Sequence, residues 1–321
     1  MIGDLRVRQC LADLWGLAAA TVEVHNGGMN SATWFVTDHG ERWVAKAVAP
    51  SSHRSFSGGL AVASALEAAG IPAGAPVATR HGDLVADVDG IPLALLTWVP
   101  GEAVPDQRLI GTTLARVHRA LRDVPVPDPE LFHWVDPDAG HLDVRPWVRP
   151  AVAAAVAAYD RLGPETLSWG LLHTDPSPEA FRAEPQEAFR AGSREALRTE
   201  SPEALRAGPP EALRRRETCG VIDWSTAMRG PLLYDVASAV MYVGGPHHAG
   251  ALVDAYLAEG VLPRAEADRA LPVMVRFRWA VQADYFARRI AHHDMTGISD
   301  PAENERGLAD AHDALAPLSE R

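Results

Sequence analysis

The spacing of the apolar residues changes about a third of the way along this 321-residue chain, and no other feature of the sequence constrains the fold as strongly. In the first third, short runs of β-branched and aromatic residues are separated by turn clusters at residues 26–28 and 38–40, a pattern typical of hairpins. Helical spacing is confined there to residues 1–20 and 59–69. The pattern predicts strands at residues 21–25, 33–37, 42–48, 83–88 and 91–99.

After Pro100-Gly101 the apolar residues recur mainly at helical spacing. The helices expected there cover residues 109–121, 148–162, 234–243, 249–259 and 265–293. A strand-rich part followed by a helix-rich part is typical of an α+β protein with two unequal lobes. We expect an N-lobe over residues 1–99 and a C-lobe over residues 100–321.

Composition and charge exclude several classes of protein. The chain is 47% hydrophobic and 22% charged, so it can bury a sizeable core, which excludes a wholly disordered, collagenous or coiled-coil chain. The balance of 42 Asp and Glu against 30 Lys and Arg gives a formal charge of −12, which argues against a nucleic-acid partner. The two cysteines, Cys10 and Cys219, cannot form a disulfide framework and lack the spacing of metal ligands.

The sequence also argues against a secreted or membrane protein. Charged residues interrupt the first twenty positions, where a secretory signal would be apolar: Asp4, Arg6, Arg8 and Asp13. The longest apolar stretch, residues 151–159, is far shorter than the roughly 20 residues that span a bilayer. We therefore expect a cytoplasmic protein, and the sequence leaves its oligomeric state open.

A repeat with a period of eight residues sets one segment apart. Glu-Ala-Phe-Arg or Glu-Ala-Leu-Arg begins at Glu179, Glu187, Glu195, Glu203 and Glu211. Prolines and glycines separate the copies, and eight is not a multiple of the helical period, so one long helix is not expected. We interpret residues 179–216 as an insertion on the surface. The alternative is an arm that binds a partner, because each copy places an apolar residue beside an arginine.

Two features of the expected N-lobe suit the binding of phosphates. The turn at residues 25–31 contains glycines, which let the backbone approach phosphate oxygens closely. Its candidate contacts are Gly27, Gly28, Asn30 and Ser31. Lys46 follows the apolar run Trp43-Val44-Ala45, where an ammonium can pair with nucleotide phosphates. Taken alone, the turn is more typical of an ordinary hairpin than of a phosphate site. The lysine taken alone is also typical of a solvated strand end.

Two carboxylates in the expected C-lobe suit phosphoryl transfer. Asp175 comes shortly after the apolar run at residues 169–172, and Asp223 directly follows the run at 219–222, as expected for side chains presented at strand ends. One carboxylate can position and deprotonate an attacking hydroxyl, while the other holds Mg²⁺ on the phosphates of a nucleotide. Each residue taken alone is also typical of a cap on a turn or helix.

These features follow one another in the order used by protein kinases. The chain resembles the aminoglycoside phosphotransferase (phosphotransferase enzyme) family, kinase-like enzymes that phosphorylate hydroxyls of small molecules. The resemblance covers nearly the whole chain outside the repeats. It is carried by the hinge-like residues 95–101, the helix at 114–118, the catalytic-loop motif His173-Thr174-Asp175, the strand end at 221–224, and residues 229–235, whose last Asp is usually structural in the family.

The resemblance implies a protein-kinase-like fold and a kinase that uses ATP or GTP with Mg²⁺. The acceptor it implies is a hydroxyl of an aminoglycoside-like or other small metabolite. By the same resemblance, Asp175 is the catalytic base or orienting group, and Asp223 is the principal Mg²⁺ ligand. Lys46 contacts the nucleotide phosphates, and the backbone around Thr97, Trp98 and Val99 binds adenine.

Three positions depart from the pattern of the family. Ala180 stands where the family has an asparagine as second metal ligand, and the adjacent Glu179 is the candidate replacement. Glu67, on the first-lobe helix, lies too near the helix end to pair with Lys46 as the glutamate of the family does. Thr174 replaces the glycine of His-Gly-Asp. The alternative is therefore a degenerate kinase-like protein that binds a nucleotide or metabolite without efficient phosphoryl transfer.

Overall fold

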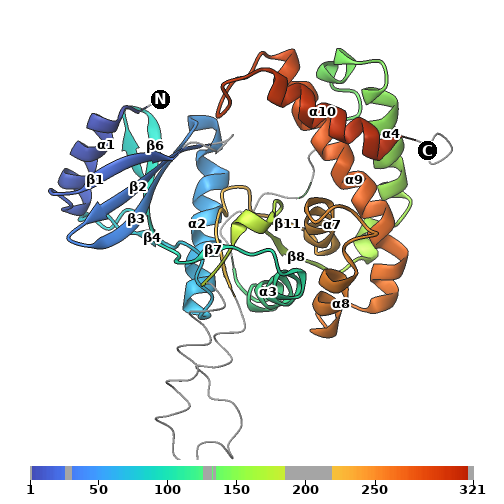
Figure 1. Cartoon of the computed structure of the whole chain (residues 1–321), viewed down its shortest axis with the longest axis horizontal. Helices are drawn as coiled ribbons and strands as arrows, with labels where there is room; N and C mark the ends of the chain where they lie inside the picture. The colour runs from blue at the N-terminus through green and yellow to red at the C-terminus, as the bar shows by residue number, and fades with distance from the viewer. Residues whose placement is uncertain (1, 26–30, 126–131, 133–134, 185–218, 317–321) are drawn as a thin grey trace, which may run out of the picture.

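The computed structural model describes residues 2–25, 31–125, 132, 135–184 and 219–316. Over these residues the chain forms a sheet-containing N-lobe and a mainly helical C-lobe, with helix α2 (His53–Ala68) between them (Figure 1). The two-lobed α+β arrangement expected from the sequence is confirmed.

The N-lobe is built on one antiparallel sheet in the order β1-β2-β3-β6-β4, with β5 also paired to β6. Lys46 lies in the central strand, opposite Thr33 of β2 and Ala94 of β6. All the strands expected from the sequence are present, and the short β4 is an addition. The bounds are β1 (Thr21–His25), β2 (Ser31–Asp38), β3 (Glu41–Val48), β4 (Pro76–Val77), β5 (Ala86–Val88) and β6 (Ile91–Thr97).

The alternation of side chains along β3 separates the two faces of this sheet. Ala45 and Ala47 join a buried cluster that includes residues of helix α1 (Asp4–Cys10). Lys46 and Val48 point to the opposite face, where Val48 packs with Phe56 and Leu60 of α2. The period-two pattern therefore places the ammonium of Lys46 on the side of the sheet that faces the C-lobe.

Helix α2 begins at His53, six residues before the start expected from the sequence. Glycine is a poor helix former, so Gly58-Gly59 gives no local signal that the helix extends further towards the N-terminus. A Cβ atom on Gly59 would overlap the carbonyl oxygen of Trp224 in the C-lobe, so the glycine is required for close approach of the two backbones. The following turns bury Val62 and Leu66 in the main core of the C-lobe.

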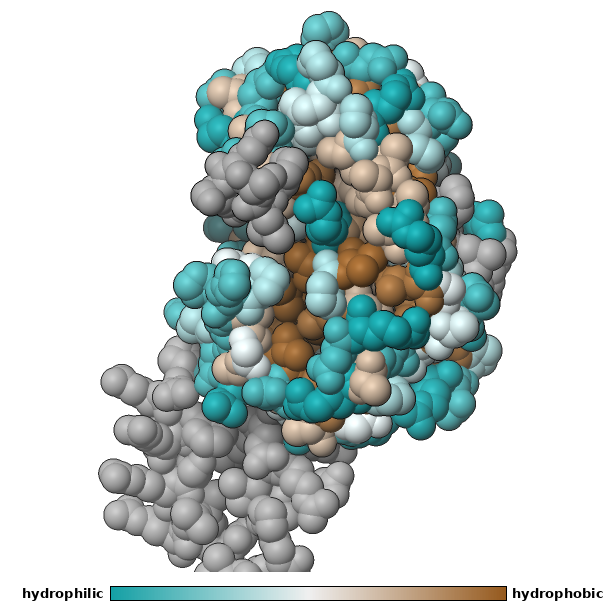
Figure 2. Space-filling model, turned by 90° about the vertical axis from the view of Figure 1, so that its right-hand side faces the viewer, coloured by the Kyte–Doolittle hydropathy of each residue, from teal (hydrophilic) through white to brown (hydrophobic). Residues whose placement is uncertain are grey.

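The C-lobe is made mostly of helices that pack around this core. The expected helices are present, and α10, which the sequence did not indicate, follows them. Apolar residues gather at the centre of its outer face, surrounded by hydrophilic ones (Figure 2). No helix in the described part of the chain is long and apolar enough to cross a membrane. The bounds are α3 (Gln107–Ala120), α4 (Val148–Asp160), α7 (Leu233–Tyr242), α8 (Gly250–Ala258), α9 (Arg264–Ala291) and α10 (Ala302–Leu315).

The first copy of the repeat belongs to the C-lobe. Its residues form a short 3-10 turn and strand β9 (Phe181–Ala183), in which the side chain of Phe181 is fully buried. Strand β9 pairs antiparallel with β7 (Glu102–Ala103) and with β10 (Gly220–Val221). Copies two to five, residues 187–214, lie outside the described residues.

We expect that deletion of residues 187–214 leaves the protein folded and slightly raises its melting temperature. Residues 184–186 and 215–219 would then join β9 to β10, a connection shorter than the roughly 12–15 residues beyond which loops are uncommon. Shortening a loop severalfold lowers the entropic free-energy cost of closing it by only about 1 kcal/mol, so the expected gain in stability is small. The melting temperature and the ATP affinity of the deletion variant test this expectation. A variant that does not fold would contradict it and show that these copies are needed by the C-lobe.

Candidate active site

The central strand of the N-lobe and the loop after β10 bring two expected site residues together. Nζ of Lys46 lies 2.5 Å from Oδ1 of Asp223. The lysine side chain is 10% exposed and the aspartate side chain is 59% exposed. An almost buried ammonium therefore has a carboxylate as its partner at the junction of the lobes.

Asp223 is held in an ionised state. Burial raises the pKa of its carboxyl, but the charge of Lys46 and the hydrogen bonds from Lys46 and Ser225 outweigh burial and lower the pKa to about 2. The Ser225 hydroxyl donates to Oδ1 at 2.9 Å, while Oδ2 accepts no hydrogen bond from the described residues. The backbone of Asp223 has a φ of 72°, an unusual conformation for a residue with a side chain. Such conformations cluster at functional sites.

The loop at residues 173–175 follows β8 (Trp169–Leu172), which pairs with β11 (Met228–Pro231). The fully buried Asp235, in the first turn of α7, accepts hydrogen bonds from the backbone N–H groups of His173 and Thr174, both at 2.7 Å. His118 of α3 contacts the same carboxylate at 3.0 Å. Asp235 thus holds the backbone of this loop in place through hydrogen bonds. This is the structural role that the resemblance implies for the last Asp of residues 229–235.

Thr174, at the position of the family's glycine, adopts a positive φ of 77°. A β-branched residue is strained in this region, at a cost on the order of 1–3 kcal/mol. The buried Thr174 hydroxyl donates to the hydroxyl of Thr226 at 2.9 Å, and this contact together with Asp235 holds the conformation. The loop therefore keeps the backbone shape that a glycine would adopt freely.

We expect that Asp235→Asn lowers the free energy of unfolding by about 2–4 kcal/mol, because an amide nitrogen would face one of the two backbone N–H donors in a buried site. Urea denaturation measures this difference. Asp254→Asn is the matched control, since its carboxylate is exposed and pairs only with exposed Arg264; a change within about 0.5 kcal/mol is expected there. Equal effects of the two substitutions would contradict the anchoring role of Asp235.

His173 joins the loop of Asp175 to the strand end of Asp223. Its Nε2 lies 2.8 Å from the carbonyl oxygen of Ile222, and its ring contacts that of Trp224 with centroids 4.6 Å apart. Asp175 is two residues beyond His173, and Asp223 directly follows Ile222. The two carboxylates are therefore carried by loops that are fixed to each other.

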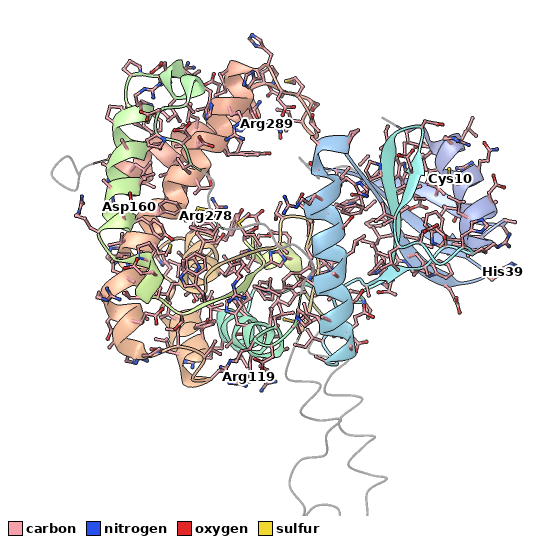
Figure 3. All side chains as sticks on the ribbon, turned by 180° about the vertical axis from the view of Figure 1, so that it is seen from behind. Cys10, His39, Arg119, Asp160, Arg278 and Arg289 are labelled. Carbon is pink, nitrogen blue, oxygen red and sulfur yellow. The ribbon has the colours of Figure 1, made fainter. Side chains whose placement is uncertain are left out.

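Asp175 itself is 57% exposed at its side chain and has two partners on the C-lobe helices. Nη2 of Arg278 donates to Oδ1 at 3.0 Å, and the hydroxyl of Tyr242 donates to the same oxygen. Figure 3 shows Arg278 on α9, below Arg289 of the same helix. The carboxylate is thus solvated on one side and anchored on the other.

The hinge residues lie at the end of β6, next to α2. The hydroxyl of Thr97 donates to Oε1 of Glu67 at 2.7 Å, and the same oxygen accepts from the backbone N–H of Ala75 at 3.0 Å. Glu67 therefore binds the hinge region and is not a partner of Lys46 among the described contacts, as its late position on the helix predicted. The guanidinium of Arg42 stacks 3.6 Å above the ring of Trp98.

An open hollow of about 440 Å³ lies beside this stack. Thr97 and Trp98 line it together with residues 40–43 of the β2–β3 turn and the start of β3. Val99, the third expected hinge residue, is buried. The structure therefore places the hinge residues where β6 ends beside β3, with Thr97 as the last residue of the strand.

The remaining expected site residues are placed as follows. Glu179 is exposed in the turn after Asp175, and Ala180 beside it is buried. Ser31 begins β2, with its hydroxyl 3.4 Å from that of Thr33. Gly27, Gly28 and Asn30 lie outside the described residues. Within the described ranges no group of three or more His, Cys, Asp or Glu residues has the arrangement of a metal site.

The sequence did not single out Arg278 and Tyr242, although both bind Asp175. Arg278 lies within the helix expected at residues 265–293, where apolar residues recur at helical spacing. An arginine among apolar residues at helical spacing is rarely buried unless it is paired with an acidic group. This was the available signal that Arg278 has a carboxylate partner. Tyr242 sits at the end of α7, where nothing in its local pattern distinguishes a ligand from a packing residue.

Comparison with known proteins defines the class to which this fold and site belong. The model of the phosphotransferase enzyme family matches residues 21–182 and 213–271. The chain is a member of the phosphotransferase enzyme family. A homoserine kinase of Xanthobacter autotrophicus (strain ATCC BAA-1158 / Py2) is 29% identical over 126 residues, 36% of this chain and 39% of that protein. The matched part of the chain thus covers less than half the length of this curated relative.

Solved structures with a similar fold extend over almost the whole chain. A microcompartment-associated aminopropanol kinase has a TM-score of 0.71 at 18% identity, covering 99% of this chain and 97% of that one. The amicoumacin kinase hAmiN, in complex with AMP-PNP, Ca²⁺ and Ami, has a TM-score of 0.69 at 13% identity, covering 98% and 93%. The aminoglycoside phosphotransferase APH(4)-Ia has a TM-score of 0.59 at 12% identity, covering 98% and 100%. The expected family and kinase-like fold are confirmed.

Proposed function

We propose that this chain is a kinase that transfers the γ-phosphoryl group of ATP to a hydroxyl of a small molecule. The observation that carries the proposal is the Lys46–Asp223 pair, joined through His173 and Ile222 to the loop of Asp175. The pair places a phosphate-binding ammonium and a carboxylate side by side at the junction of the lobes. Asp175 adds a half-exposed carboxylate that an acceptor can reach.

Asp223 has one carboxylate oxygen that accepts no hydrogen bond from the described residues, which supports the proposal that it holds a magnesium ion bound together with a nucleotide. Asp223 would hold it, with Glu179 as the second protein ligand, because Mg²⁺ prefers carboxylate oxygens and commonly takes only one or two of them beside phosphates. When bound, the ion neutralises charge on the phosphates. Ala180, a methyl group at the position of the family's asparagine, supplies no ligand.

The residues of the chain supply positioning, which is most of what phosphoryl transfer requires. Lys46 holds the nucleotide phosphates, and the backbone at residues 97–99 binds the base. Asp175 accepts the hydrogen of the acceptor hydroxyl as that oxygen attacks. ATP is favoured over GTP as donor because two structures of similar fold contain AMP-PNP and ADP.

We assign the acceptor to small molecules that carry both an amine and a hydroxyl. The compounds named for similar proteins support this class: homoserine, aminopropanol, choline or ethanolamine, and spectinomycin. The formal charge of −12 makes a cationic acceptor easier to accommodate than an anionic one.

A second candidate, a nucleotide-binding protein without efficient transfer, is favoured by Ala180 and by the exposure of Glu179. Two measurements on the purified full chain separate the candidates. Calorimetry measures ATP affinity with and without Mg²⁺, and coupled ADP release with ³¹P NMR of the products measures transfer to homoserine, aminopropanol, choline, ethanolamine and spectinomycin. A phosphorylated product supports the kinase. Tight ATP binding without a product supports the second candidate.

A further inference from the structure

We propose that Arg278 and Tyr242 position the carboxylate of Asp175, by binding Oδ1 so that Oδ2 is presented to the acceptor hydroxyl. This inference rests on the proposed function and deepens it. It assigns to each carboxylate oxygen a separate task, which neither the motif nor the family match provides.

The contacts divide the two oxygens of Asp175. Oδ1 accepts from Nη2 of Arg278 at 3.0 Å and from the hydroxyl of Tyr242. Oδ2 accepts no hydrogen bond from any described residue. Because the side chain of Asp175 is 57% exposed, its unbound oxygen faces accessible space. Two donors on one oxygen and none on the other fix the rotation of the carboxylate.

The guanidinium that binds Asp175 is itself rigidly held. The side chain of Arg278 is only 9% exposed, and its Nε donates to the hydroxyl of Ser238 at 3.0 Å. Ser238 and Tyr242 are four residues apart on α7, so they lie on one face of that helix. The tyrosine hydroxyl lies 3.3 Å from Nη2 of the arginine. One face of α7 therefore binds the guanidinium at two atoms, Nε through Ser238 and Nη2 through Tyr242.

To donate to Asp175, Arg278 must be charged and the phenol of Tyr242 must be protonated. Burial lowers the pKa of Arg278, but its interactions with Tyr234, Tyr242 and Asp175 outweigh burial and give a net upward shift, so it stays charged. Burial and the charge of Asp175 raise the pKa of Tyr242, so its phenol stays protonated and donates. Both groups are donors throughout the neutral pH range.

The chemical step follows from this division. The acceptor hydroxyl donates its hydrogen to Oδ2, and its oxygen forms a bond to the γ-phosphorus of ATP. The bond between that phosphorus and the β,γ-bridging oxygen breaks, and ADP leaves with the electron pair. The proton of the hydroxyl remains on Oδ2 of Asp175 until it passes to solvent. An unanchored carboxylate would reach this geometry only part of the time, which lowers kcat.

Two conservative variants test the assignment, with the acceptor that turns over fastest among homoserine, aminopropanol, choline, ethanolamine and spectinomycin as the probe. Tyr242→Phe removes one donor and should lower kcat about 3- to 10-fold. Arg278→Lys keeps the charge but loses the planar fork and should lower kcat about 10- to 100-fold. The KM for ATP should stay within about twofold in both, because the two residues act through Asp175, which serves the acceptor.

A double-mutant cycle separates positioning from a general structural effect. In an Asp175→Asn background the same two substitutions should change kcat by less than about twofold, since groups that act as a unit have non-additive effects. Two matched controls should retain wild-type kcat. Tyr159→Phe alters a tyrosine packed against Phe277, and Arg276→Lys alters an α9 arginine that donates to the carbonyl oxygen of Leu315.

The outcomes are distinct. A loss of kcat at constant KM for ATP that vanishes in the Asp175→Asn background supports the inference. Unchanged kcat in Tyr242→Phe and Arg278→Lys, or equal losses with and without Asp175, overturns it while the wild-type activity still supports the kinase. Absence of transfer by the wild type overturns the proposed function, and the inference falls with it. If Arg278→Lys does not fold, Tyr242→Phe alone decides, because it removes one hydroxyl from a partly exposed side chain.

Discussion

Replacing Asp223 by alanine should lower the rate of Mg²⁺-dependent phosphoryl transfer from ATP by at least about 10³-fold, because charge stabilisation by a bound metal is worth several kcal/mol. In the described part of the chain, Asp223 is the carboxylate that lies beside Lys46 at the junction of the lobes. Its pKa of about 2 keeps it ionised and able to bind a cation at any pH used for an assay. Steady-state transfer to the best acceptor measures the loss.

Controls must account for Lys46, which loses its partner in this variant. A nearly buried ammonium without a carboxylate destabilises the fold, so the comparison needs Asp223→Asn, which keeps the size of the side chain and an oxygen for Lys46. Ser225→Ala removes only the hydrogen bond to Oδ1 and should retain most of the activity. Circular dichroism and the melting temperature establish that each variant is folded. Wild-type rates in folded Asp223→Ala would rule out the metal assignment.

Asp175→Asn should lower kcat about 10²- to 10⁴-fold and leave the affinity for ATP unchanged. The amide oxygen can still accept from Arg278 and Tyr242, so the loop keeps its anchor. The amide nitrogen then faces the acceptor hydroxyl with hydrogens where an acceptor atom is needed, and it cannot take up the proton. Transfer kinetics together with calorimetric ATP binding measure the two effects separately.

The exposed Asp254 of α8, paired with the exposed Arg264 of α9, provides the matched control, and Asp254→Asn should behave as the wild type. Equal losses of ATP affinity and turnover in Asp175→Asn would identify Asp175 as a structural carboxylate instead. Loss of turnover with intact ATP binding would show that Asp175 acts on the acceptor and not on the nucleotide.

Local patterns were sufficient to predict the N-lobe sheet. Its strands alternate, and its turns contain glycine, asparagine and aspartate, so both signals depend only on neighbouring residues. Asp175 and Asp223 were also selected as candidate site residues on a local signal, because each follows a short apolar run. The roles of both residues in phosphoryl transfer stay predictions.

Features that depend on distant contacts were not predicted. The sequence placed the start of α2 too late. Gly59 is inside the helix because a side chain there would overlap the backbone of Trp224, which is far away in the sequence. Arg278 binds a residue 103 positions earlier, so its neighbours on α9 give no indication of its partner. Thr174 adopts the conformation of a glycine because Asp235 and Thr226 hold it, and both lie beyond the insertion.

The packing of α2 also determines how the two lobes can move. Val62 and Leu66 of this helix lie in the main core of the C-lobe, and Gly59 is in close contact with Trp224. The sheet of the N-lobe holds the same helix through a much smaller apolar cluster, in which Phe56 and Leu60 meet Val48. Hinge motions occur where packing is weakest. In an opening and closing cycle α2 would therefore travel as a rigid part of the C-lobe, and the sheet, with Lys46 on it, would rock across the helix.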